Sequence, residues 1–173
     1  MRRGDPFANF TMGRSYWLES DLETSLVWLD RATTLNPNYA HGIYARAWAQ
    51  TISGHGKQGL ANVDTAWSLS PLDPLAYAML GTRALAHVVL GEYTRAAEFG
   101  ESAARSPGAH VLIAMIAALG HLLAGDPVAA ARWARNVRQR RSDLSAADFL
   151  HAFPFTERAL RRRVCAALAQ LDF

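Results

Sequence analysis

The side chains in this sequence that could do chemistry are a few histidines and carboxylates and a single cysteine. His87 and His121 stand at equivalent places of two neighbouring sequence repeats, so they are a conceivable metal site. A metal-binding helix usually supplies a further His, Cys, Asp or Glu ligand three or four residues away. Neither histidine has such a neighbour, so we predict no metal and no cofactor and interpret both as partly buried side chains.

The carboxylates and the cysteine do not form a recognisable catalytic group either. Glu98 and Glu101 share one helical face. Arg95 and Arg105 flank them at helical spacing, which is typical of solvated ion pairs. The sequence contains no Gly-x-Ser-x-Gly, His-Glu-x-x-His or Walker motif. Cys165 lies beside the apolar face of the last expected helix, where we predict a buried, inert thiol. We therefore expect a protein that is not an enzyme.

The composition indicates helices. The 173 residues include 32 Ala and 21 Leu but only 4 Ile and 8 Val, and β-branched residues are the ones that favour strands. The longest apolar stretch, residues 111–124, is interrupted by Gly120 and His121 and is shorter than the ~20 residues of a membrane span. Asp5 and Pro6 stand where a signal peptide would need an apolar run. We therefore expect an all-α, cytoplasmic chain that does not enter a membrane.

Turn-forming residues divide the chain into a regular pattern. Four turns are expected, separated by 34, 37 and 34 residues, at Ser20, Gly54, Gly91 and Gly125. A period of about 34 residues is typical of repeats that each form one helical hairpin. The longer separation indicates a three-residue insertion, either in the connection at residues 70–74 or as an extra turn of the next helix.

Small residues keep the same register about each turn. They stand seven positions before it, five after it and twelve after it, which would let the helices of one hairpin and of the next approach closely. The twelve positions are Gly13, Ala47, Ala84, Ala118, Ser25, Gly59, Ala96, Ala130, Ala32, Ala66, Ala103 and Val137. The pattern predicts helix pairs over residues 6–18 and 21–35, 38–53 and 57–70, 74–90 and 92–105, and 109–124 and 127–141.

Two Asp-Pro pairs support these boundaries. Asp73-Pro74 and Asp126-Pro127 each place a side-chain acceptor at the N-cap and a proline at the first helical position. We therefore expect helices to begin at Pro74 and at Pro127.

Residues 143–173 leave the repeat register and are expected to form a two-helix cap. Ser145 and Asp148 match a capping box for a short helix, and Thr156 is a candidate N-cap for a final helix. An array of repeats ends in exposed apolar surface, which a cap must cover. We therefore predict two units, a repeat array over residues 1–142 and capping helices over residues 143–173.

The repeats resemble the tetratricopeptide family, whose pattern is Trp-x2-Leu-Gly-x2-Tyr, then Ala-x3-Phe, then Pro. The first repeat reads Asn9-x2-Met12-Gly13-x2-Tyr16, then Ser25-x3-Leu29, then Pro37. Later repeats keep single positions, among them Ala47, Ala66, Pro71, Gly91, Tyr93, Ala96, Gly125 and Ala130. The resemblance covers about residues 6–142 and implies an α-solenoid of about four hairpins. The tail is similar to tails of multidomain bacterial signalling proteins, in which such repeats follow a class III nucleotide cyclase or a winged-helix DNA-binding domain.

In that family the first helices of the repeats line a concave groove, and the resemblance places eight side chains there. They are Phe7, Phe10, Arg14, Trp17, His41, Tyr44, Trp48 and Leu85. Monomeric proteins seldom expose so apolar a surface unless something binds it, and aromatic and Arg side chains dominate binding energy at interfaces. We therefore expect a scaffold whose groove binds a peptide or helix of another protein, with Arg14 meeting a carboxylate or a backbone carbonyl. On this interpretation Trp48→Arg removes binding and spares the fold.

Several alternatives stay open. The same side chains could pack between helices as core, or the C-terminal helix could fold back into the groove. A functional alternative is self-association, in which the groove or an array end pairs two chains within a larger signalling protein, a cyclase or a transcriptional regulator. We expect no nucleic-acid partner, because the Arg-rich residues 131–173 lack interleaved aromatics for base stacking and the groove lacks side chains that read bases.

Overall fold

The computed structural model describes residues 4–173, which form helices joined by turns and loops, without a strand in that range. The helices are α1 (Pro6–Leu18), α2 (Leu22–Leu35), α3 (Ala40–Ile52), α4 (Gly56–Leu69), α5 (Ala76–Leu90), α6 (Tyr93–Arg105), α7 (Val111–Leu123), α8 (Pro127–Arg140), α9 (Ala146–Ala152) and α10 (Arg158–Ala169). Their ends lie within two residues of the expected ones. None of the helices in the described part of the chain is long and apolar enough to cross a membrane.

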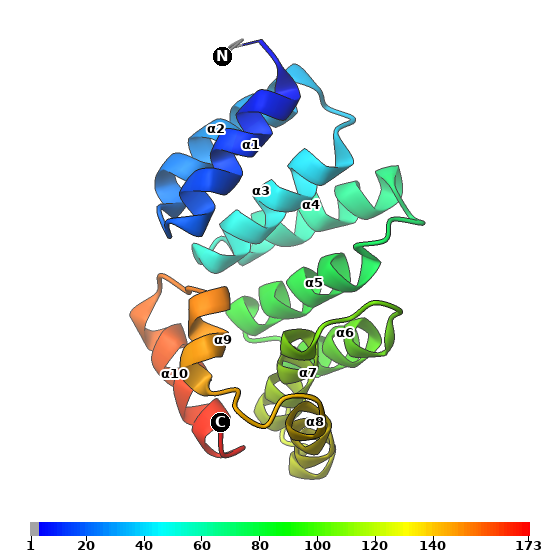
Figure 1. Cartoon of the computed structure of the whole chain (residues 1–173), viewed down its shortest axis with the longest axis vertical. Helices are drawn as coiled ribbons and strands as arrows, with labels where there is room; N and C mark the ends of the chain where they lie inside the picture. Colours follow the sequence, from blue (N-terminus) through cyan, green and yellow to red (C-terminus); the bar gives the residue numbers. More distant parts are fainter. Residues whose placement is uncertain (1–3) are drawn as a thin grey trace.

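The first eight helices form four antiparallel hairpins that stack one after another, so the expected all-α solenoid is confirmed (Figure 1). Each hairpin packs on the next through the second helix of one and the first helix of the other, as in α2 on α3 and α6 on α7. The first helices α1, α3, α5 and α7 also contact one another in sequence along one side of the stack. The short helices α9 and α10 lie along the stack beside α5 and α7 (Figure 1).

The four hairpin turns fall where the sequence predicts them. Ser20, Gly54, Gly91 and Gly125 all adopt the left-handed backbone conformation, with φ angles of 63°, 88°, 75° and 83°. This conformation reverses the chain directly after a helix, and glycine adopts it without the steric cost of a Cβ atom. Ser20 is the one turn residue of the four that bears that cost.

The twelve small-residue positions are all buried between helices. In the first hairpin a Cβ atom on Gly13 would lie 2.6 Å from Leu29 Cγ. The Ser25 hydroxyl donates a 2.7 Å hydrogen bond to the Gly13 carbonyl across the same contact. Small side chains at these positions are therefore what allows the helices to approach so closely.

The two Asp-Pro pairs behave differently. Asp126 accepts a 2.9 Å hydrogen bond from the Ala129 N–H, and α8 begins at Pro127 as expected. The expectation for Asp73 is wrong: α5 begins at Ala76, and Asp73 is held in the preceding turn instead. The three-residue insertion is divided between the connection and the helix that follows it. The connection covers residues 70–75, and α5 has 15 residues where α3 and α7 have 13.

The tail keeps one of its two expected caps. Ser145 and Asp148 form the reciprocal capping box at the start of α9. Thr156 does not cap α10, which begins at Arg158. The Thr156 N–H instead donates a 3.1 Å hydrogen bond to the Ile52 carbonyl at the end of α3, which ties the tail to the second hairpin.

The main core is continuous from the hairpins into the tail. Leu29, Leu85 and Met115 of the array belong to the same buried cluster as Phe149 of α9 and Val164 of α10. Burial of apolar surface on this scale is the main stabilising contribution to folding. The tail is therefore packed on the array through its own aromatic and aliphatic side chains.

Candidate binding groove

A cavity of about 350 Å³ opens between the first helices of the first three hairpins. Helices α1, α3 and α5 supply its walls from residues three or four positions apart, which helical geometry places on one face. The lining residues are Phe10, Arg14, Trp17, His41, Tyr44, Ala45, Leu75 and Ala78. We call this space the groove.

The Arg14 side chain is positioned by two aromatic rings of its own helix. Its guanidinium carbon lies 5.8 Å from the ring centroid of Phe10 and 5.2 Å from that of Trp17. Cation–π attraction favours this arrangement. None of the ion pairs formed among residues 4–173 includes Arg14. The groove therefore carries a cationic donor that lies against two rings and has no carboxylate partner in the described part of the chain.

A buried carboxylate lies behind the opposite wall of the groove. His41 Nε2 lies 3.0 Å from Asp73 Oδ2, and because an ionised carboxylate only accepts, His41 is the donor. The Ser70 hydroxyl and the Leu75 N–H also donate to Asp73, at 3.0 and 2.8 Å. Desolvation acts to raise the pKa of Asp73, but these hydrogen bonds and the His41 charge outweigh it and hold the pKa below its usual value.

Tyr44 lines both the groove and a second cavity. Burial raises the pKa of Tyr44 to about 12, and a hydrogen bond with the Thr82 side chain opposes that shift by less. The second cavity, of about 280 Å³, shares Trp17, Tyr44 and Ala78 with the groove. The two cavities therefore form one elongated depression along α1, α3, α5 and α7.

Two stacked indoles form the floor between the cavities. The ring centroids of Trp17 and Trp48 lie 3.9 Å apart, with 26° between the ring planes. Trp48 is only 4% exposed, while Trp17 covers it and faces the groove. Trp48 therefore acts mainly as a core residue that supports the Trp17 ring.

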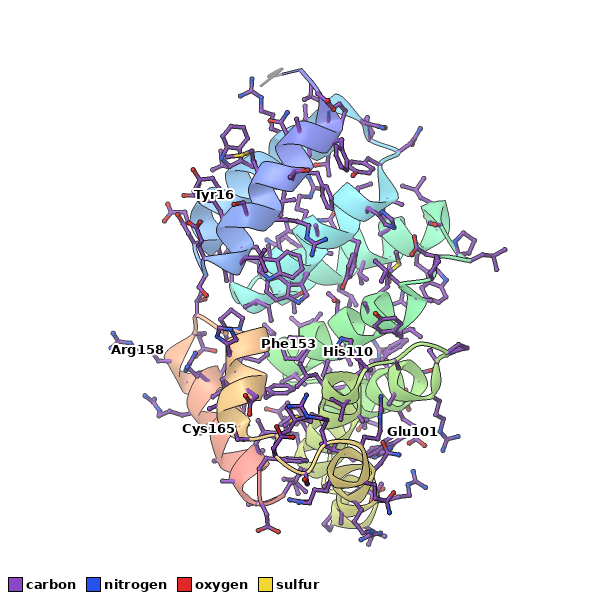
Figure 2. The ribbon with its side chains drawn as sticks, viewed as in Figure 1. Tyr16, Glu101, His110, Phe153, Arg158 and Cys165 are labelled. Atoms are coloured by element: carbon purple, nitrogen blue, oxygen red, sulfur yellow. The ribbon has the colours of Figure 1, made fainter. Side chains whose placement is uncertain are left out.

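The tail closes the second cavity. Ala152, the last residue of α9, and Phe153 after it form its far wall, and Figure 2 shows Phe153 near the centre of the molecule, where α9 faces α5. Phe153 and Phe155 are buried, at 7% and 2% exposed. The chain's own tail thus lies at the part of this face nearer α7 and leaves the part nearer α1 open. It does so through the end of α9 and Phe153, and not through the C-terminal helix, whose fold-back was the alternative considered from the sequence.

The structure brings five of the eight expected groove residues together around the groove. These five are Phe10, Arg14, Trp17, His41 and Tyr44. Phe7 lies one turn away, 65% exposed, with its ring centroid 6.2 Å from that of Phe10. Leu85 is 1% exposed and belongs to the core, so its placement in the groove is wrong. The reason is that Leu85 is buried in the main core of the array and tail, which residue type alone does not reveal.

Of the three further residues that line the groove, Ala78 also stands at a groove position in the family resemblance, and Leu75 and Ala45 were missed. Leu75 was expected in the first turn of a helix, but it ends the turn at residues 73–75 and faces the groove. Ala45 follows Tyr44 and fills the floor of the groove. For Leu75 the sequence offered one signal: the three-residue insertion after α4 shows that the repeat pattern is broken in the connection that contains this residue.

Two histidines outside the groove, His87 and His121, each pair with a glutamate. His87 is buried, with Nδ1 2.7 Å from Glu92 Oε2 and its ring stacked on Phe99 at a centroid distance of 5.3 Å. His121 Nε2 lies 2.8 Å from Glu101 Oε2. Within residues 4–173 no three His, Cys, Asp or Glu side chains lie close enough to hold a metal ion.

Two expectations outside the groove need correction. Glu101 pairs with Arg105 as expected, but it also meets His121 and accepts a 3.1 Å hydrogen bond from Arg132, so it joins three helices instead of standing in a solvated ladder. Cys165 is exposed and not buried. It follows the buried Val164, and one step along a helix turns the side chain by about 100° away from the core; Figure 2 places it on α10.

No family model matches this chain. No curated protein matches it either. Among solved structures, the crystal structure of PilW, a widely conserved type IV pilus biogenesis factor, superposes with a TM-score of 0.76. The sequence identity is 16%, and the match covers 99% of this chain and 78% of PilW.

The fold is tetratricopeptide-like. The likeness to PilW spans both the hairpin array and the tail of this chain, since nearly all of its residues are covered. The helix order, the hairpin turns and the buried small residues described above are the physical basis of that likeness.

Proposed function

We propose that this chain is a non-catalytic scaffold that binds a peptide segment of another protein in the groove. The observation that carries the proposal is a cavity of about 350 Å³ lined by Phe10, Trp17 and Tyr44 with Arg14 at its edge. Binding sites are typically concave, mainly apolar and marked by a few placed polar groups. The rings sit on packed helices, so little conformational entropy is lost when a ligand enters.

Two further observations support a role with protein partners. The fold is shared with PilW, whose name describes a factor in the biogenesis of an assembled structure. The His87–Glu92 and His121–Glu101 pairs outside the groove join neighbouring helices, a structural role that agrees with a scaffold.

The test is to fill the groove. Ala78→Phe places a ring inside it, and Ala61→Phe places the same ring on the exposed face of α4 as the matched control. Wild type and both variants would be used to select from a phage-displayed library of random short peptides. We expect peptides that bind wild type and Ala61→Phe and lose at least about tenfold in affinity for Ala78→Phe, a change of about 1.4 kcal/mol.

Circular dichroism and thermal unfolding would first establish that all three proteins are folded. Peptides that bind the three proteins equally well would show that binding occurs outside the groove. Selection that enriches no peptide on wild type would count against the scaffold proposal itself.

Self-association is the second candidate, and a separate observation favours it. Leu69, Leu72 and Leu75 are all exposed at the connection beside the groove, and Leu72 is 95% exposed. Exposed apolar clusters mark contact surfaces. We propose as the alternative a regulatory domain that pairs two chains within a larger signalling protein, a cyclase or a transcriptional regulator. Analytical ultracentrifugation of wild type and Leu72→Ser tests it: a dimer that Leu72→Ser dissociates supports it, and a wild-type monomer at high concentration contradicts it.

The cellular setting and the division of the chain also remain proposals. We place the chain in the bacterial cytoplasm, which the single cysteine supports because a reducing compartment does not favour disulfides. We propose residues 1–142 as the repeat array and residues 143–173 as the unit that caps it.

A further inference from the structure

We infer that the segment bound in the groove carries an acidic side chain next to an aromatic or large aliphatic one. The acid would meet Arg14, and the apolar side chain would enter the cavity between Phe10, Tyr44 and Leu75. This inference rests on the proposed function and narrows the partner to one chemical class of peptide.

The first step of the argument is the charge of Arg14. Its guanidinium is held above the Phe10 and Trp17 rings and pairs with no carboxylate of residues 4–173. The planar guanidinium offers two parallel N–H donors that match the two oxygens of a carboxylate. Because stacking on the rings already restricts the side chain, binding an acid costs less side-chain entropy here than at a free surface arginine.

The second step is the charge of the surroundings. None of the eight residues that line the groove is acidic, and His41 and Arg14 are the residues among them that can carry a positive charge. The nearby carboxylate, Asp73, is 5% exposed and is engaged by His41, Ser70 and Leu75. It forms no ion pair with Arg14, so the guanidinium stays available to an anionic group of a ligand.

The third step favours a peptide over a small organic acid. The groove continues through Trp17, Tyr44 and Ala78 into the second cavity, so the depression is longer than one ligand side chain requires. The chain's own tail already covers the far end with Phe153, and the Thr156 N–H bonds to the Ile52 carbonyl. A segment of this chain with an aromatic side chain therefore already occupies one end of this face, which is how we expect a peptide of a partner protein to occupy the open end.

The test uses the full chain and peptides selected on it. Each selected peptide would be synthesised as found and with every Asp and Glu replaced by Asn and Gln. Affinities would be measured for wild type, Arg14→Gln, Arg14→Lys and the control Arg31→Gln, which changes an exposed arginine of α2. We expect Arg14→Gln to weaken the acidic form about tenfold and the amidated form by less than about twofold, with Arg14→Lys intermediate and Arg31→Gln unchanged.

Three results would overturn the inference. One is equal affinity of wild type and Arg14→Gln for the acidic peptides. Another is a selected set without acidic residues whose binding Ala78→Phe still abolishes, which would leave the groove proposal intact and remove only the charge argument. The last is a wild-type dimer that Ala78→Phe dissociates, because a second copy would then be the occupant.

Discussion

At the scale of single residues, the Asp73 carboxylate shows how a buried charge is kept at the edge of the groove. Burial alone would raise its pKa and favour the protonated form. Three donors from two directions, the Leu75 N–H, the Ser70 hydroxyl and the His41 ring, reverse that effect. The price of desolvation is thus met by hydrogen bonds that also fix the turn before α5.

Replacing this carboxylate is expected to make stability depend less on pH. The pKa of Asp73 is lower in the folded state than in the unfolded chain, so its contribution is present above about pH 4 and is lost as the pH falls through the folded-state pKa. Asp73→Asn should lower the free energy of unfolding by about 1–3 kcal/mol at pH 7, and the deficit should shrink below about pH 4. Urea unfolding at several pH values measures both.

Asp30→Asn is the control, since Asp30 also pairs with an arginine but its side chain is 60% exposed. Its effect should stay within about 1 kcal/mol. A deficit for Asp73→Asn that persists unchanged at pH 3 would mean that the side chain acts through its shape and not through its charge.

Burial changes the expectation for Trp48. The Trp48 indole is 4% exposed and stacked on Trp17. An arginine in its place must either lose the water around its charge or push the neighbouring helices apart. Trp48→Arg is therefore expected to destabilise the fold by more than about 3 kcal/mol, and Trp48→Ala by about 3–5 kcal/mol. Wild-type thermal stability of Trp48→Arg would restore the earlier view of Trp48 as a groove residue.

At the scale of the elements, the same local rules set the four hairpins. A left-handed residue ends the first helix of each, and small side chains line the contact between its two helices. These features depend on neighbours within about one helical turn or one hairpin, which explains why the helix ends follow from the sequence. The two Asp-Pro pairs show the limit: Asp126 caps α8, whereas Asp73 is drawn to His41 from another hairpin.

Ser20 offers a direct test of the turn geometry. It has a φ of 63° where the other three hairpins have glycine. Ser20→Gly should raise the free energy of unfolding by about 0.5–1 kcal/mol, because the strain of a left-handed residue with a Cβ atom outweighs the added flexibility of the unfolded chain. Chemical denaturation measures the gain.

The reverse exchange is the companion experiment. Gly91→Ser has open space for its Cβ atom but a φ of 75°, so it should lose a similar amount. A destabilised Ser20→Gly would show that loss of backbone entropy dominates at this turn.

At the scale of the whole molecule, the tail and the array depend on one another. Phe149 and Phe155 are buried in the same core as the hairpins, and the Thr156 N–H bonds to the Ile52 carbonyl. The tail therefore stabilises the stack and also limits how far the groove extends. The opposite face of α10 points away from the array, and Figure 2 shows Arg158 projecting outward from it.

Phe155 is the residue whose loss should release the tail. Phe155→Ala removes a side chain that is 2% exposed and should lower the free energy of unfolding by about 3–5 kcal/mol. Hydrogen exchange should rise in α9 and α10 before it rises in α1 and α2, since the lost contacts lie at the tail. Phe7→Ala, at a 65% exposed position, is the control and should leave exchange unchanged. Uniform acceleration along the chain would mean that tail and array unfold as one unit.

The sequence by itself determined what depends on neighbours along the chain. The helices, the positions of the turns and the small residues between helices follow from propensity, capping and periodicity. The family resemblance, and not the periodicity alone, named the five expected residues that line the cavity, and their spacing of three or four positions on α1 and α3 gives them one helical face.

Only the tertiary structure decided which apolar side chains are covered. Leu85 and Trp48 are of residue types that also suit a groove wall, but both are buried in the main core, and Trp17 stacks on Trp48. Cys165 is exposed because of the rotation of α10 about its axis. Asp73 precedes a helix that begins later than expected, and it bonds to His41, 32 residues away, as well as to the nearby Ser70 and Leu75. Burial and long-range pairing depend on contacts between distant segments, and helical periodicity specifies one face of a helix without specifying what packs against it.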